Sequence, residues 1–204
     1  MMKATLTTLA LLLGTALAQA QALGPWTTAG DVLANGGTTQ LSTAYDGSDA
    51  PGPLSASGAV DISALEAQAG VAPYALDLSG AEYATEGSLI HQSFSVLAGQ
   101  TLSFDWSFST LETQFQDRAF VVVNGQVSTL TTATGAISGH FSQLFGSAGT
   151  VSLAIGVIDT VDYLGTSTLT LSNMSLSPVP EPTSLALMAG GLGLVALRRR
   201  ANRS

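Results

Sequence analysis

From Ser88 onward, apolar and polar residues alternate along the chain, and this period of two is the strongest constraint on the fold. The clearest case is Leu102–Ser109, in which large apolar residues take every second position: Leu102, Phe104, Trp106 and Phe108. Successive side chains of a β-strand point to opposite faces, so this segment predicts a strand with one buried face. Similar alternation occurs in Ser88–Leu97 and in Val151–Val157. Such strands bury their apolar face against a second layer, which predicts an all-β protein built as an antiparallel β-sandwich.

Turn signals divide these predicted strands. An Asn-Gly pair at 124–125 separates two apolar runs and predicts a β-hairpin with a two-residue turn. In the last strand, the apolar phase changes between Leu171 and Met174, which predicts a β-bulge near Asn173. The connections between the other strands are long, and this favours a jelly roll over a simple meander.

Only one short helix is predicted. Ser63–Glu66 has the pattern of a capping box, and Gly70 would end the helix after about two turns. The region before it, residues 24–60, is rich in Gly, Ser and Thr with scattered apolar positions, and contains a clear loop at Asp46–Pro53.

The N-terminus has the features of a secretory signal peptide. Lys3 provides a positive charge, Leu6–Leu17 is apolar, and two Ala-x-Ala sites follow at 16–18 and 18–20. We therefore assign residues 1–20 to a signal peptide cut by signal peptidase, and residues 22–177 to one extracellular β-sandwich domain. The chain has no cysteine, which excludes disulfides and thiol catalysis.

The predicted domain is strongly acidic. Residues 22–177 contain thirteen acids and a single base, Arg118, a net charge of −12. Such a surface repels nucleic acid and anionic lipid, so we expect no nucleic-acid partner. It tolerates neutral sugars and attracts cations.

The C-terminal residues 178–204 form a three-part tail. Pro180, Glu181 and Pro182 precede an apolar segment, Thr183–Leu197, and the cluster Arg198, Arg199 and Arg200 follows it. A helix of 15 residues reaches about 22 Å, whereas the hydrocarbon core is about 30 Å thick. The segment 183–197 is therefore a transmembrane helix only with local thinning, and a poor permanent anchor. The arginines should stay in the cytoplasm, which places the domain outside.

This tail resembles the PEP-CTERM sorting signal of Gram-negative bacteria that make extracellular polysaccharide. The resemblance implies that the membrane enzyme exosortase reads the Pro-Glu-Pro motif and processes the tail. The protein would then be anchored transiently in the inner membrane and reach the cell surface or the medium. The alternative is an ordinary C-terminal anchor with a chance Pro-Glu-Pro.

A second resemblance covers residues 26–176, which are similar to a recurrent extracellular domain of PEP-CTERM proteins. The matching segments are Glu86–Ser88, Gln92–Phe94, Gly99–Trp106, Asp117–Val121 and Val157–Asp159. The resemblance implies a jelly roll like those of galactose-binding and carbohydrate-binding modules. Members often carry an Asp-Asn pair in the last strand, where this chain has Ser172-Asn173.

Four aspartates in predicted loops are candidates for a structural calcium site: Asp46, Asp49, Asp159 and Asp162. Calcium takes six to eight oxygen ligands from carboxylates and loop carbonyls. Neither loop matches the EF-hand pattern, and solvated loop acids are the alternative interpretation.

A catalytic site has less support. Asp105, Glu112 and Asp117 lie in one strand–loop–strand unit and could supply the two carboxyls of a glycan hydrolase. The alternative is that these acids bind backbone amides, with Arg118 as a local partner. His91 and His140 are predicted to be surface or edge histidines, since no Gly-x-Ser-x-Gly motif accompanies them.

Among the large aromatics, Tyr45 and Tyr163 are the candidates for stacking on sugar rings, because each lies beside an aspartate in a loop. Trp106 is in phase with the core and is predicted to be buried. The sequence therefore favours a non-catalytic protein of the cell surface, extracellular matrix or biofilm that binds exopolysaccharide. A glycan hydrolase and a protein-binding adhesin with an exposed apolar patch are the alternatives.

Overall fold

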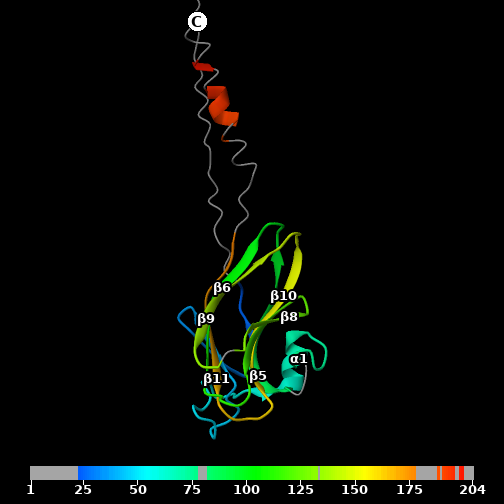
Figure 1. Ribbon diagram of the computed structural model, residues 1–204. Coiled ribbons are helices and arrows are strands. Elements are labelled where there is room, and N and C mark those ends of the chain that lie inside the picture. Colours follow the sequence, from blue (N-terminus) through cyan, green and yellow to red (C-terminus); the bar gives the residue numbers. More distant parts are fainter. Residues whose placement is uncertain are drawn as a thin grey trace, which may run out of the picture. The chain divides into compact units, whose positions relative to one another are not determined.

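Two antiparallel β-sheets form the core of the computed structural model, which describes residues 23–77, 82–132, 134–177, 188, 190–195 and 198–199 (Figure 1). All strands belong to one compact unit, Ala20–Pro178. The five-stranded sheet has the order β2-β3-β11-β6-β9, formed by Asp31–Asn35, Thr38–Ser42, Ser167–Leu176, Thr101–Thr110 and Ile137–Leu144. The six-stranded sheet has the order β1-β5-β10-β7-β8, formed by Thr27–Ala29, Ala84–Val96, Gly149–Thr160, Arg118–Val123 and Gln126–Thr131, with β4 (Val60–Asp61) paired to β5.

The strand order is that of a jelly roll. After β5 the chain passes from sheet to sheet at each connection except the β7–β8 hairpin, which keeps two consecutive strands in one sheet. Four strands in the order β3-β11-β6-β9 therefore face four in the order β5-β10-β7-β8. This arrangement confirms the predicted antiparallel β-sandwich of jelly-roll type.

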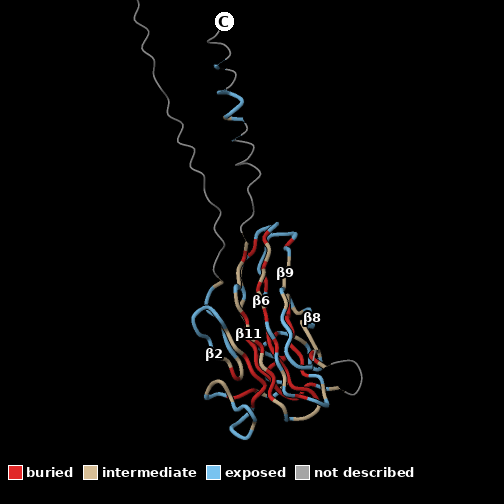
Figure 2. Tube along the Cα trace, turned by 60° about the vertical axis from the view of Figure 1, so that its left-hand side comes forward, coloured by how far each residue is buried: buried red, intermediate tan, exposed pale blue. Residues whose placement is uncertain are grey.

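The main core lies between the sheets, and the predicted alternation of β6 is correct. Leu102, Phe104 and Phe108 are fully buried, and Trp106 is 9% exposed. From the other sheet, β10 contributes Val151, Leu153, Ile155 and Val157. Figure 2 shows the buried positions along the strands of the sandwich. Burial of each large apolar side chain stabilises the fold by about 1.5–3 kcal/mol.

A second, smaller core covers the outer face of the six-stranded sheet. Helix α1 (Ile62–Ala69) and the turn after it place Leu65, Ala69 and Leu76 over side chains of the sheet, namely Leu89, Phe120, Val122, Ala154 and Ile158 (Figure 1). As a result, five of the six residues of β7 are buried. The six-stranded sheet is thus covered on both faces, and the five-stranded sheet on one.

The start of α1 differs from the prediction. Asp61 is the N-cap and accepts a hydrogen bond from the Ser63 amide, so the helix begins at Ile62. Glu66 does not close a capping box; it is buried and accepts hydrogen bonds from the amides of Tyr74 and Leu76. The predicted stop is correct, since Gly70 adopts the left-handed conformation with φ 70°.

The predicted hairpin and bulge are also confirmed. Asn124 and Gly125 have φ values of 52° and 77° between β7 and β8, as a two-residue turn of this type requires. In β11 the register with β6 shifts between Ser172 and Ser175, and Asn173 has φ 52°.

Several strands were not predicted. The strands β1–β4 have two to five residues each, and in β9 five of eight residues are exposed, so none shows a buried period of two. These strands lie at or near sheet edges, where few side chains reach the core.

The predicted signal peptide, residues 1–20, and the motif Pro180–Pro182 lie outside the described residues, as does most of the predicted membrane segment 183–197. In the tail, the described residues 188, 190–195 and 198–199 are helical. None of the helices among the described residues combines the length and apolar character needed to cross a membrane.

Candidate ligand-binding face

The outer face of the five-stranded sheet is lined by short polar side chains. Because β6 alternates, burial of its large residues turns Ser103, Asp105, Ser107 and Ser109 outward. Register with the neighbouring strands places Ser138, Ser107 and Thr170 in one row, and His140, Asp105 and Ser172 in the next. The face therefore offers mainly hydroxyl groups, with one carboxylate and one imidazole.

Two hollows follow these rows. One has a volume of about 520 Å³ over Asp105 and His140, and the other about 330 Å³ over Ser109 and Thr168. They share Ser107, Ser138 and Thr170, so they are parts of one shallow groove. We call it the hydroxyl groove; its side chains are Asp105, Ser107, Ser109, Ser138, His140, Thr168, Thr170 and Ser172.

Asp105 is the centre of the charged end of the groove. Its Oδ1 lies 2.6 Å from His140 Nδ1, and its Oδ2 accepts a hydrogen bond of 2.7 Å from Asn173 Nδ2. The bulge turns Asn173 toward Asp105 across the strand pair. The hydrogen bond from Asn173, and then that from His140, lowers the pKa of Asp105, so this exposed carboxylate stays ionised. The Nε2 atom of His140 is left for another partner.

Gly139 of β9 leaves room for the Trp106 ring on the inner face of the five-stranded sheet. A Cβ atom at Gly139 would lie 2.5 Å from the Trp106 ring. The absence of a side chain lets the indole pack beneath β9, and Trp106 stays in the core as predicted.

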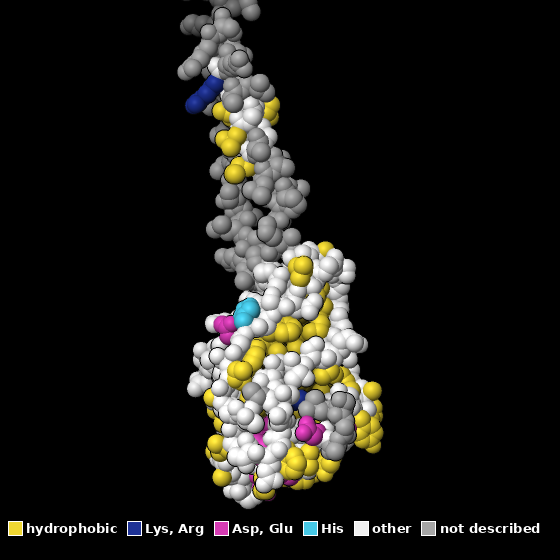
Figure 3. Space-filling model, viewed as in Figure 1, with side chains coloured by type: hydrophobic (Ala, Val, Ile, Leu, Met, Phe, Trp, Pro, Cys, Tyr) yellow, Lys and Arg dark blue, Asp and Glu magenta, His cyan; other side chains and the backbone are white. Residues whose placement is uncertain are grey.

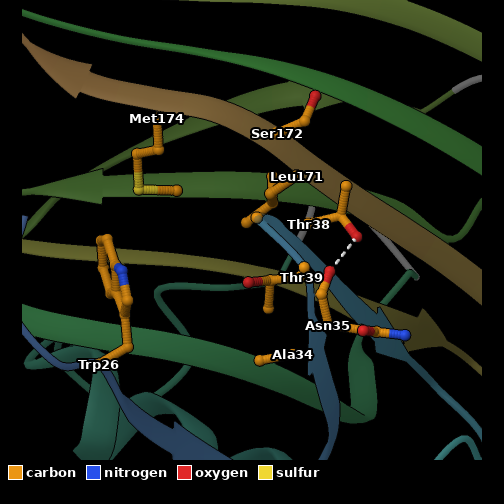
Figure 4. Close-up of a pocket in the computed structure, with 10 residues that line it drawn as sticks. Trp26, Ala34, Asn35, Thr38, Thr39, Leu171, Ser172 and Met174 are labelled. Carbon is orange, nitrogen blue, oxygen red and sulfur yellow. Dashed lines mark hydrogen bonds between the residues drawn. The ribbon is translucent and has the colours of Figure 1, made fainter. Parts of the chain in front are cut away.

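A further hollow of about 340 Å³ lies beside Trp26 and the β2–β3 turn. Trp26 and Met174 lie on one side of it, and Asn35 and Thr38 on the other (Figure 4). Thr38 Oγ1 donates a hydrogen bond of 2.8 Å to the carbonyl of Asn35. Trp26 is half-buried, because it also packs against the main core.

The predicted stacking residues lie elsewhere. Tyr45 is 53% exposed and Tyr163 59% exposed, on the loops after β3 and β10. These two loops are neighbours, since Thr166 Oγ1 donates a hydrogen bond of 2.8 Å to the carbonyl of Pro51. Neither tyrosine lines the hydroxyl groove or the hollow at Trp26. Their role in sugar stacking stays a prediction.

Three of the four predicted calcium ligands are used locally. Asp49 Oδ2 accepts hydrogen bonds from the amides of Tyr45 and Asp46, Asp46 Oδ1 binds the amide and hydroxyl of Ser48, and Asp162 Oδ1 binds the amide of Leu164. Asp159 differs, because it is buried in β10. In the part of the chain that the structure describes, no three acids or histidines are grouped as metal ligands. Calcium at these four positions stays a prediction.

The acids considered for glycan hydrolysis do not line one groove. Glu112 Oε1 accepts hydrogen bonds from the amides of Thr113 and Gln114, and Asp117 is fully buried. Asp105 alone of these three lines the groove. Arg118 is not their partner, since its guanidinium donates to the carbonyl of Leu76, beneath α1.

Three acids meet between the sheets, and we call them the inner acid cluster: Glu86, Asp117 and Asp159. Each is at most 2% exposed. Burial raises the pKa of Glu86 to about 8, with smaller contributions from nearby acids. Burial likewise raises the pKa of Asp117 and that of Asp159. The alternation could have identified them, because they lie two residues from the inward positions Ser88, Ala119 and Val157.

Comparison with known proteins concerns mainly the tail. Residues 178–200 match the model of the PEP-CTERM protein-sorting motif. The tail is a PEP-CTERM sorting signal. The match includes Pro180, Glu181, Pro182 and the arginines 198–200, as predicted, and the motif implies an exported protein that exosortase sorts and processes.

For the domain before the PEP-CTERM tail, the comparisons give only weak similarity to solved structures. No curated protein matches the chain. Seven solved chains match, among them one described as "CBM4 structure and function", with a TM-score of 0.36 and 10% identity over 75% of this chain and 94% of that one.

Proposed function

We propose that this exported protein is a non-catalytic binder of neutral polysaccharide, and that the hydroxyl groove is its binding surface. The observation that carries the proposal is the contrast between the two outer faces of the sandwich. Helix α1 covers one, while the other is open and presents rows of hydroxyl groups around Asp105 and His140. Hydroxyl, carboxylate and imidazole groups all hydrogen-bond to sugar hydroxyls.

Charge supports a neutral ligand. The domain has a net charge of −12 over residues 22–177, which repels polyanions. Few charged side chains are visible on the face of the molecule in Figure 3. Export by the PEP-CTERM pathway suits a glycan outside the cell, and we propose the cell's own exopolysaccharide matrix as the partner.

The groove favours binding over hydrolysis. A glycosidase places two carboxyls about 5–9.5 Å apart across the scissile bond. Asp105 is the one carboxylate among the described residues that line the groove. Its lowered pKa also makes it unsuitable as a general acid, which must hold a proton near neutral pH.

Binding can be tested with the full-length chain in detergent, first on an array of neutral glycans and then by calorimetry. Ser107→Leu should fill the shared part of the groove and weaken binding at least about tenfold, because a ligand would lose one or more hydrogen bonds. Ser128→Leu, at an exposed position of β8 outside the groove, is the matched control. Equal affinity of the two variants, or no glycan binding by the wild type, would refute the proposal.

Sorting is tested separately in the cell. Glu181→Ala removes the acid of the Pro-Glu-Pro motif and should leave the protein in the inner membrane with its tail uncut. Mass spectrometry of the wild type should detect a protein shortened near Pro180–Pro182. An intact tail on surface-bound wild type would contradict processing there.

A further inference from the structure

The inner acid cluster lies on three adjacent strands of the six-stranded sheet. Ile158 of β10 is opposite Gly87 of β5 and Arg118 of β7, and the register with β5 shifts between Ile158 and Thr160. Asp159 lies at this irregularity, close enough to Asp117 and Glu86 for their charges to act on it. All three side chains are on the face that meets the other sheet, since Val157, Ser88 and Ala119 share their phase. A hydrogen bond across the sandwich supports this placement, since Ser167 Oγ of β11 donates to Asp117 Oδ2 at 2.6 Å.

The three carboxyl groups differ in the hydrogen bonds that they accept. Asp117 uses both oxygens, accepting from Ser167 and from the Thr160 amide at 3.2 Å. By contrast, Glu86 Oε2 and Asp159 Oδ1 are fully buried and have no hydrogen-bond partner among the residues that the structure describes. Leaving carboxylate oxygens unpaired in a protein interior is costly. Two such oxygens on neighbouring strands indicate a missing positive partner.

The protein provides no base for this role among the described residues. Arg118 is adjacent in sequence to Asp117, but its guanidinium donates to the Leu76 carbonyl on the opposite face of the sheet. Further acids surround the cluster, and the charges of Asp46, Asp49 and Asp162 act on Glu86 or Asp159. The local potential therefore favours uptake of a cation.

We propose that Glu86 and Asp159 bind a divalent cation, Ca²⁺, between the two sheets. The donors in the cluster are oxygens without sulfur or imidazole, which suits Ca²⁺ and not zinc. No three acids are grouped as metal ligands among the described residues, so neutral oxygens must complete the six to eight ligands.

This site differs from a loop site at Asp46, Asp49 and Asp162, because those side chains already bind backbone amides. A cation at Glu86 and Asp159 would join β5 to β10. It would also neutralise the interior where the loops after β3 and β10 meet, and so stabilise that end of the sandwich.

The first test uses the full-length chain in detergent, stripped with EDTA and then titrated with CaCl₂. Calorimetry should give one Ca²⁺ per chain. At a hundredfold excess over Kd, linkage should raise the Tm by about 5–11 °C. NaCl at matched ionic strength and MgCl₂ should do less. If Ca²⁺ raises the Tm no more than NaCl does, the proposal is wrong.

Two isosteric variants locate the site. Glu86→Gln and Asp159→Asn should each abolish the Ca²⁺-dependent rise in Tm. In EDTA their Tm should equal or exceed that of the wild type, because each removes a buried unpaired acid. The control is Asp61→Asn, an exposed acid opposite Glu86 in the register, where Asn keeps the helix cap. A full Ca²⁺ response in Asp159→Asn, or its loss in Asp49→Asn instead, would overturn the assignment.

Discussion

The two sheets of the sandwich share a core but differ on their outer faces. In the six-stranded sheet, β7 is buried on both faces, because Phe120 and Val122 belong to the outer core that α1 and the turn after it complete. In the five-stranded sheet, β6 alternates between buried apolar and accessible polar residues. The covered face contributes to the stability of the fold, and the open face is accessible to a ligand. The acids differ in a related way, since Asp105 lies on the open outer face and Glu86 is buried in the interior between the sheets.

The largest expected effect is on the shared core. Trp106→Ala should reduce the free energy of unfolding by about 3–5 kcal/mol, because it leaves a cavity against both sheets. Its neighbour Ser107 faces outward, and Ser107→Ala should change stability by less than about 0.5 kcal/mol. Chemical denaturation measures both. Equal midpoints would mean that the inner and outer faces of β6 are reversed.

The covered and open outer faces can be compared directly. Leu65→Ala removes a fully buried side chain of α1 and should cost about 2–5 kcal/mol. Thr170→Ala, on the outer face of the five-stranded sheet, should cost about 0.5 kcal/mol or less. If the two variants lose similar stability, the contrast between the faces does not hold.

The inner and outer acids should respond to pH with opposite sign. In EDTA, native Glu86 keeps its proton up to about pH 8, whereas the unfolded chain loses it near the ordinary value of 4.5. The native state therefore binds more protons in this window, and stability falls as pH rises from about 4.5 to 8. We expect a loss of about 1–3 kcal/mol, which Glu86→Gln should reduce.

Asp105 provides the opposite case. Its pKa is lowered in the native state. Its contribution to stability is therefore present above the ordinary pKa of 3.8 and is lost as pH falls through the lower native value. Asp105→Asn should leave the slope between pH 4.5 and 8 unchanged. An identical slope in wild type and Glu86→Gln would show that the buried acid does not cause it.

The smallest expected effect is on the bulge. Asn173→Gly removes the amide that binds Asp105 but tolerates φ 52°. The pKa of Asp105 should rise toward its ordinary value, because this hydrogen bond is the main cause of its shift. Stability should change by less than about 1 kcal/mol. An NMR titration of the Asp105 carboxyl in both proteins checks the expectation, and an unchanged midpoint would contradict it.

Local patterns predicted much of the domain, because each rests on interactions between residues close in sequence. The period of two identified β6 and β10, the Asn-Gly pair located the β7–β8 turn, and the change of phase located the bulge at Asn173. The pattern failed for β9, where five of eight residues are exposed, and for the strands before α1, which have at most five residues each. An edge strand leaves little hydrophobic signal because it has little to bury.

By itself, the sequence determined the sorting signal of this protein and the inner and outer faces of its main strands. The order of motif, apolar segment and arginines in the tail needs no fold to be read, and the alternation in β6 decides which side chains face the core. Only the tertiary structure decided what lies together. It brings His140 and Asn173 to Asp105 from 35 and 68 residues away, and gathers Glu86, Asp117 and Asp159 in one interior. The physical reason is that neighbours across a sheet follow from strand order and register, which spacing along the chain does not encode.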